Sequence, residues 1–334
     1  MDKIRLSICI PTYNYGAFIG ETLNSITDQL EPDAESVEVV VVDGASTDNT
    51  PQVVENFRGR IPKLVYHRLD RKGGIDSDLE RTVDLAHGEY CWLLSSDDVQ
   101  TPGALSRILH EIEAGYDIYL FNRTECDKDL RPRRNASWLS PDIEDSIFPF
   151  TNHGEFISYF KRSRSIGALF SYISSIIVRR EKWLTIPRHE KLIGSNYAHV
   201  FRLFSILLNG GVLKYIKDPL VLCRGDNDSF LDNGLFHRYL IDIDGYLLLA
   251  SELFPDEPVR RAFLAVMRRE HDWRQFVGLK SAVSIHAADN AKWIDLERKL
   301  LKYGYPRAEL FVVRMLGSSR FLRRLVYFFI RLVT

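Results

Sequence analysis

Short apolar runs alternate with amphipathic stretches along the first 125 residues of the chain. Continuous runs rich in β-branched residues are typical of parallel strands, which are buried on both faces of a sheet. They predict five strands: Leu6–Ile10, Val37–Val42, Leu64–Leu69, Glu89–Leu94 and Asp117–Asn122. Apolar residues at helical spacing predict the helices between them: Gly16–Leu30, Asp48–Phe57, Ile75–Ala86 and Thr101–Glu113. Strands that alternate with helices imply right-handed crossovers, and therefore an α/β fold with a mainly parallel sheet and helices on both faces.

The pattern becomes irregular after this segment. Residues 127–150 combine several prolines with the basic stretch Arg131–Arg134 and predict a loop or flap. From residue 153 a short helix is followed by a strand, a helix and a strand: Ser171–Arg179, Ser195–Leu208 and Val212–Leu222. After Asp232 the pattern is helical almost to the end. We therefore predict one α/β domain over residues 1–230, in two halves (1–125 and 126–230), and a helical C-terminal extension over residues 231–334.

Composition narrows the classes of protein that the chain fits. The chain has 44 Lys and Arg residues and 45 Asp and Glu residues, so its net charge is close to zero. No overall positive charge therefore indicates a nucleic acid as the partner. The four cysteines lie far apart and form no paired motif, which argues against a zinc site or a disulfide framework. The N-terminus lacks the pattern of a signal peptide, and no run of about 18 apolar residues predicts a spanning helix. We expect a cytoplasmic protein.

Polar residues cluster where the predicted strands end. Pro11–Asn14 follows the first strand, Asp43–Asp48 the second, Arg71–Asp78 the third and Ser95–Asp98 the fourth. Any one of these segments is also compatible with turn chemistry alone. Because the carboxyl ends of parallel strands meet at one edge of a sheet, where ligands bind, we expect all four segments to face one crevice.

The segment Ser95–Asp98 places two carboxylates side by side. Adjacent buried carboxylates repel each other, and a divalent cation such as Mn²⁺ or Mg²⁺ relieves that repulsion. Such a cation binds one or two carboxylates together with substrate phosphates, and it neutralises charge on a leaving diphosphate. The alternative is that both acids favour the N-terminus of the helix that begins near Pro102.

Three motifs, in this order and spacing, resemble the catalytic domain of glycosyltransferase family 2: Pro11–Asn14, Val41–Thr50, and Ala86–Tyr90 leading to Leu94–Asp98. The resemblance covers residues 4–125 strongly and 150–225 loosely. It implies a GT-A fold with a Rossmann-like sheet, in which the first half binds a nucleotide sugar and the second half faces the acceptor. A weaker similarity, in Gly73–Asp78 and Arg224–Ser229, points toward abequosyltransferase-like enzymes of O-antigen assembly.

The resemblance also implies which residues contact the nucleotide sugar. Thr12, in the turn that includes Tyr13 and Asn14, would lie against the nucleotide. Asp43 would contact the base, and Asp76 or Asp78 would line the pocket.

The metal-binding element of the family is usually Asp-x-Asp or Asp-x-Asp-Asp, and Ser95 stands here in place of the first acid. Ser96 and Asp97 would contact the substrate. Asp97 and Asp98 would bind the cation, with Asp98 the better candidate for direct contact with metal and diphosphate.

An inverting transferase of this kind needs a general base to take the proton of the acceptor hydroxyl. Family members often use Glu-Asp at the start of a helix in the second half, but the corresponding segment Gly194–His199 has no carboxylate. His199 is a candidate because imidazole titrates near neutral pH, although a histidine on an apolar helix face is often structural. Asp226 and Asp228 are the alternative bases.

The C-terminal segment 311–334 contains five arginines, no acid, and many aromatic and aliphatic residues. This pattern is typical of a basic amphipathic helix at a membrane interface, although a helix packed on the domain or on a second subunit fits it too. The membrane hypothesis agrees with an acceptor carried on a polyprenyl diphosphate, which the family resemblance implies. It would place the protein on the inner face of the cell membrane.

The sequence leads to one main function and two alternatives. The main hypothesis is a metal-dependent, inverting transfer of a sugar from a nucleoside diphosphate sugar to a saccharide hydroxyl. The first alternative is a nucleotidyltransferase that makes the activated sugar, but the exit Pro11–Gly16 lacks the Lys or Arg of a phosphate loop. The second is a non-catalytic nucleotide-sugar-binding protein, which the missing acids would suit.

Overall fold

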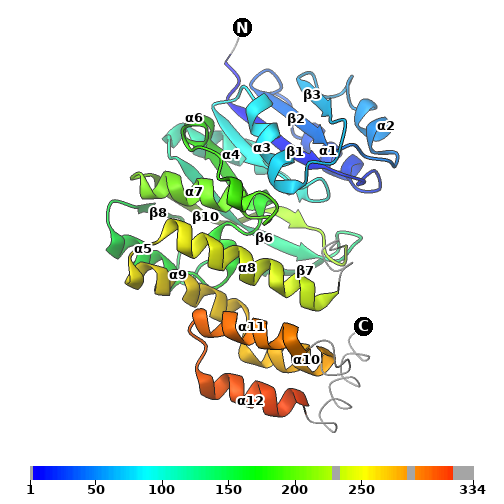
Figure 1. Ribbon diagram of the computed structural model, residues 1–334. Coiled ribbons are helices and arrows are strands. Elements are labelled where there is room, and N and C mark those ends of the chain that lie inside the picture. The colour runs from blue at the N-terminus through cyan, green and yellow to red at the C-terminus, as the bar shows by residue number, and fades with distance from the viewer. Residues whose placement is uncertain (1–2, 228–233, 284–289, 319–334) are drawn as a thin grey trace. The chain divides into compact units, whose positions relative to one another are not determined.

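The computed structural model describes residues 3–227, 234–283 and 290–318. It combines a central sheet with helices, which confirms the predicted α/β class (Figure 1). The chain divides into two compact units. The first comprises residues 1–159 and 167–227, and the second comprises residues 160–166 and 228–334.

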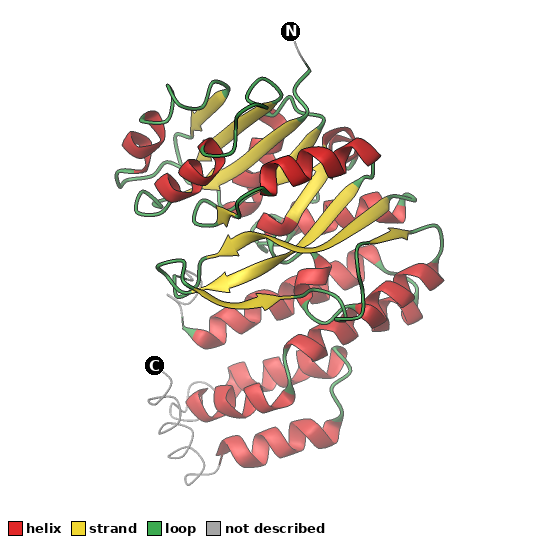
Figure 2. Cartoon of the chain, turned by 180° about the vertical axis from the view of Figure 1, so that it is seen from behind, coloured by secondary structure: helices red, strands yellow, loops and turns green. Residues whose placement is uncertain are grey.

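A sheet runs through the first unit (Figure 2). It has ten strands in the order β3-β2-β1-β4-β9-β6-β10-β5, with β7 beside β6 and β8 beside β10. Its strands are β1 Leu6–Thr12, β2 Val37–Asp43, β3 Leu64–Arg68, β4 Tyr90–Leu93, β5 Val99–Gln100, β6 Ile118–Cys126, β7 Pro132–Ala136, β8 Ser146–Pro149, β9 Ile176–Arg179 and β10 Val212–Cys223. The pairs among β3, β2, β1 and β4 are parallel, as predicted. Beyond them the sheet is mixed, because β9 is antiparallel to both β4 and β6.

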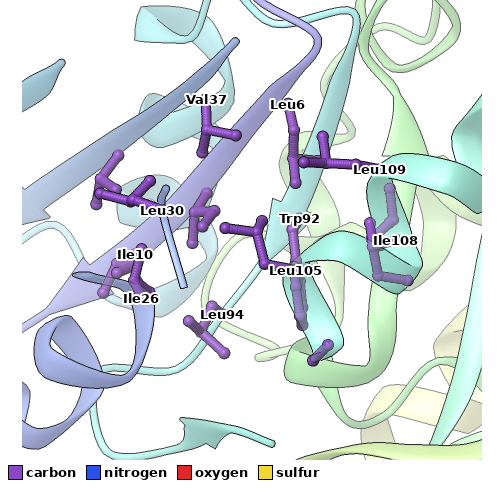
Figure 3. Packing of buried hydrophobic residues seen from close by; sticks show 14 of the residues in the cluster. Leu6, Ile10, Ile26, Leu30, Val37, Trp92, Leu94, Leu105, Ile108 and Leu109 are labelled. Carbon is purple, nitrogen blue, oxygen red and sulfur yellow. The ribbon is translucent and has the colours of Figure 1, made fainter. Parts of the chain in front are cut away.

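Helices cover both faces of this sheet. The helices are α1 Ile19–Thr27, α2 Thr50–Glu55, α3 Ile75–Leu85, α4 Ala104–Glu111, α5 His153–Arg162, α6 Arg180–Thr185 and α7 Ala198–Leu208. On one face, Leu6 and Ile10 of β1 form a core with Ile26 of α1 and Ile108 of α4 (Figure 3). Side chains alternate along a strand, so Cys9 belongs to the opposite face, and there α3 contacts β1 and β2. Leu6, Ile10, Ile26 and Ile108 are all fully buried.

The prediction of an irregular segment over residues 127–150 is only partly right, because β7 and β8 lie within it, among turns and bends. Strand β7 pairs with β6 around a turn in which the Asp127 carboxylate accepts the backbone N–H groups of Asp129 and Arg131. Four of its five residues are exposed, so the strand has no apolar alternation that a sequence pattern reveals. The strand predicted from Ser171 begins only at Ile176, after the short 3₁₀ helix Ile173–Ser175.

The second unit is helical, as predicted for residues after Asp232. Its helices are α8 Leu235–Leu253, α9 Glu257–Glu270, α10 Trp273–Val283, α11 Asn290–Lys302 and α12 Arg307–Ser318. Tyr246, Phe263, Phe276 and Leu296 are buried within it. Within the described ranges, no helix combines the length and apolar character that crossing a bilayer requires. Most of the predicted basic segment, residues 319–334, lies outside the described residues.

Candidate active site

The exits of β1 and β2 are joined by hydrogen bonds. Thr12 is in register with Asp43, and the N–H of Gly44 donates to the Thr12 carbonyl at 2.9 Å. The N–H of Asn14 donates to the Ser46 hydroxyl at 2.8 Å, and Asn14 has a left-handed backbone with φ of 57°. The first two polar segments therefore form one structure at the edge of the sheet.

Asp43 is fully buried at the end of β2. Its Oδ1 accepts the N–H of Ser46, and its Oδ2 accepts the hydroxyl of Tyr66, both at 2.7 Å. Burial raises the pKa of Tyr66, and the neighbouring carboxylate raises it further, so the phenol stays protonated and donates. The nearby hydroxyl of Thr12 is buried and finds no hydrogen-bond partner among the described residues. A buried polar atom without a partner is costly, so this one fits a ligand.

Asp76 lies in the first turn of α3 and is committed to the protein backbone. Its carboxylate accepts the N–H groups of Gly194, Asn196 and Ala198 at 2.8, 2.9 and 3.1 Å. Burial raises the pKa of Asp76, while these N–H groups act in the opposite direction. Asp76 thus fixes the turn that precedes α7.

Asp78 lies two residues further along α3 and is directed toward the exit of β2. A Cβ atom on Gly44 would lie 2.7 Å from its Oδ2, so the carboxylate sits where only a glycine leaves room. Its Oδ1 is buried without a partner among the described residues. Burial raises the pKa of Asp78 to about 6, opposed by Lys72 and reinforced by Asp43. The Lys72 ammonium lies 4.0 Å from the ring centre of Tyr13, which is half-buried beside this group.

Asp98 is buried after β4 and holds three hydrogen bonds. Its Oδ2 accepts the hydroxyls of Tyr172 at 2.7 Å and Ser174 at 2.5 Å, and its Oδ1 accepts the N–H of Arg224 at 3.0 Å. A carboxylate offers about four lone-pair positions, so about one remains. Burial raises the pKa of Asp98 to about 7, and the charge of Asp97 adds to this effect.

Asp97 is half-buried, and its carboxylate accepts fewer hydrogen bonds than that of Asp98. Its Oδ1 accepts the Ser95 hydroxyl, and its Oδ2 accepts the amide of Asn227 at 2.7 Å. About two lone-pair positions stay open, which suits a divalent cation. Among the described residues, no three His, Cys, Asp or Glu side chains gather into a metal cluster. Asp97 therefore fits a cation whose other ligands are water and substrate phosphates, while Ser96 is buried beside it.

The two halves of this site lie close together because of strand order. Both β2 and β4 flank β1, and Asp43 is in register with Thr12, while Leu93 is in register with Cys9. Neighbouring strands are about 4.8 Å apart, so the exits of β2 and β4 are separated by about 10 Å across the sheet.

The candidate bases differ in their surroundings. His199 is buried in α7, and its Nε2 lies 2.9 Å from the Phe170 carbonyl, to which it donates. Burial lowers the pKa of His199 to about 4, so the ring is neutral at pH 7. Asp226 is exposed and accepts two hydrogen bonds from Arg133, at 2.6 and 3.1 Å. Asp228 lies outside the described residues.

Comparison with known proteins adds to these observations. The sequence profile of "Glycosyl transferase family 2" matches residues 7–183. The chain is 38% identical over 273 residues to the abequosyltransferase RfbV of Salmonella typhimurium, spanning 80% of this chain and 81% of that one. It is 30% identical over 165 residues to the GalNAc(5)-diNAcBac-PP-undecaprenol beta-1,3-glucosyltransferase of Campylobacter jejuni, spanning 48% of this chain and 52% of that one.

The fold has solved counterparts. The 1–349 fragment of Staphylococcus aureus TarS, in complex with UDP, matches with a TM-score of 0.64 at 20% identity, over 97% of this chain and 86% of that one. This likeness confirms the predicted GT-A fold. The matched profile covers more than half of the chain and includes the exits of β1, β2 and β4. The chain therefore belongs to glycosyltransferase family 2.

Proposed function

We propose that the protein transfers a sugar, with inversion, from a nucleoside diphosphate sugar to a hydroxyl of a saccharide acceptor. The observation that carries the proposal is the pair of unpartnered buried atoms, Thr12 Oγ1 and Asp78 Oδ1, beside the buried carboxylate of Asp43. A nucleoside offers the hydroxyl and amine groups that would satisfy them. On this assignment residues 1–125 bind the donor, and residues 126–230 face the acceptor.

We further propose that Asp97, supported by Asp98, holds Mn²⁺ or Mg²⁺. The sequence favoured Asp98 for direct contact, but its three hydrogen bonds leave less room than the two on Asp97. The cation would stabilise the charge that develops on the departing nucleoside diphosphate. The residues of the chain bind and orient the donor around that position.

For the general base, the surroundings favour an acid of the segment after β10 over His199. His199 donates its Nε2 proton to a carbonyl in the interior, whereas a base must reach the acceptor hydroxyl. Asp226 belongs to a segment that contacts Asp97 through Asn227, and its exposed pair with Arg133 is weak enough to exchange. Asp226→Asn and Asp228→Asn should each be tested. The variant whose kcat falls by at least about 100-fold identifies the base.

We propose an acceptor carried on a lipid diphosphate, in O-antigen assembly, and contact with the membrane through the C-terminal segment. The Campylobacter relative acts on a PP-undecaprenol-linked saccharide by its name. Within the described part of the segment, Phe311 and Met315 of α12 are each 60% exposed. Replacing both by Ser should reduce flotation of the full chain with anionic phospholipid vesicles, whereas replacing the exposed Leu184 of α6 should not. Equal flotation of both variants contradicts the membrane contact.

The function is tested by a thermal-shift panel of UDP, GDP, CDP and dTDP, with and without Mn²⁺, followed by a transfer assay with the matching nucleotide sugar. A ligand that binds only the folded state raises the melting temperature. One of the four diphosphates should raise the melting temperature, and more strongly with Mn²⁺. If none of them does, the proposed donor site is refuted. Release of pyrophosphate from a nucleoside triphosphate would favour the nucleotidyltransferase. Binding of a nucleoside diphosphate without sugar transfer would favour the non-catalytic alternative.

A further inference from the structure

The segment Arg224–Asn227 follows β10 and lies against the Asp97–Asp98 turn, although more than 120 residues separate them in sequence. The N–H of Arg224 donates to Asp98 Oδ1, and its Nε donates to the carbonyl of Asp97, both at 3.0 Å. Arg224 therefore holds both residues of the turn: its main-chain N–H holds Asp98, and its side chain holds Asp97.

The Arg224 side chain is only 2% exposed, and every nitrogen of its guanidinium has an acceptor. One terminal nitrogen donates to Glu21 Oε2 of α1 at 3.0 Å, and the other donates to the carbonyl of Lys128. The group also lies 4.9 Å from the ring centre of Phe18. A buried charge persists only when it is paired and hydrogen-bonded, so this planar fork is locked in one position.

Asn227 acts on the carboxylate itself. Its amide donates to Asp97 Oδ2 at 2.7 Å, while the Ser95 hydroxyl donates to Oδ1. Both donors are neutral, so the two oxygens are oriented from both sides without a second negative charge at this point. An acid at position 95 would instead repel Asp97.

We propose that Arg224 and Asn227 are positioning residues for the cation proposed at Asp97: Arg224 fixes the turn, and Asn227 fixes the rotation of the Asp97 carboxylate. This inference rests on the proposed function. It predicts that cation affinity depends on two residues that follow the last parallel strand and that need not touch the cation themselves. Groups that orient a metal ligand affect metal affinity by about 10- to 100-fold.

The test measures Mn²⁺ binding directly, by the loss of the free Mn²⁺ signal in electron paramagnetic resonance, on the full chain with the diphosphate chosen by the thermal-shift panel. Asn227→Ala should bind Mn²⁺ about 10-fold more weakly. It should need correspondingly more Mn²⁺ for half-maximal transfer but recover its kcat at saturation. A purely structural role would lower the melting temperature and leave both Mn²⁺ constants unchanged.

Lys128→Ala is the matched control, because the only group of Lys128 that Arg224 contacts is the main-chain carbonyl, which this change keeps. Arg224→Lys tests the guanidinium and should also weaken Mn²⁺ binding, since an ammonium group cannot make three directed bonds in one plane. Unchanged Mn²⁺ affinity in Asn227→Ala, or an equal loss in Lys128→Ala, overturns the inference while transfer by the wild type still stands. Weakened Mn²⁺ binding in a protein that transfers no sugar would instead support the inference and refute the proposed function.

Discussion

Replacing Asp78 by Asn should stabilise the protein and weaken nucleotide binding at once. The carboxyl is buried, one oxygen has no partner among the described residues, and its pKa is raised from 3.8 to about 6. At 1.36 kcal/mol for each pH unit, the ionised side chain costs the folded state about 3 kcal/mol. Below about pH 4 the carboxyl is protonated in both states and the cost is absent. The cost grows as the pH rises, because Asp78 loses its proton in the unfolded state at a lower pH than in the folded state. It reaches its full value above about pH 6. A neutral amide of the same shape avoids it.

Thermal unfolding at pH 4 and pH 8 measures this effect. The wild type and Asp78→Asn should have similar melting temperatures at pH 4. At pH 8 the melting temperature of Asp78→Asn should be about 6 °C or more above that of the wild type. The variant should also lose most of the stabilisation that the preferred nucleoside diphosphate gives the wild type, because it lacks the open carboxylate oxygen. Asp84→Asn, an exposed acid of the same helix, is the control and should change little. An Asp78→Asn effect that does not depend on pH, or lower stability at pH 8, would refute the reasoning.

Four other substitutions separate the roles of individual residues. Asp97→Asn should abolish metal-dependent transfer without lowering the melting temperature, whereas Asp98→Ala should lower both, because it strands the buried hydroxyl of Ser174 and the N–H of Arg224. Asp76→Ala should destabilise the protein by about 3 kcal/mol, measured by chemical denaturation, because it strands three backbone N–H groups, with nucleotide affinity largely kept. His199→Gln should leave the pH profile of kcat unchanged, and loss of an acidic limb near neutral pH would restore His199 as the base.

The sequence predicted much of the sheet and part of the site. Strands β1, β2 and β4 are mostly apolar and fully buried, so their positions and their polar exits could be found from the pattern alone. The groups that hold Asp98 could not, because Tyr172 and Ser174 come more than 70 residues later and reach it only through the pairing of β9 with β4. Tyr66, the partner of Asp43, lies inside β3, where a tyrosine is unremarkable.

Sequence reasoning could establish that Asp76 and Asp78 have different roles, but not which of the two lines the pocket. Residues two apart on a helix are turned by about 200° from each other, so they cannot both face one pocket. The structure directs Asp76 to the turn before α7 and Asp78 to Gly44. Helical geometry required the two acids to have different roles, and only tertiary contacts could assign them.

The two acid pairs of the site obey one physical rule. In each, one carboxylate accepts three hydrogen bonds from the protein and is nearly saturated, and the other accepts fewer and keeps more open lone pairs: Asp76 against Asp78, and Asp98 against Asp97. Identical side chains therefore differ in chemistry because of the number of donors each receives. The saturated member fixes the backbone, so the open member is held ready for a ligand without rearrangement. Removing a donor from a saturated acid should thus affect stability first, whereas adding one to an open acid should compete with the ligand.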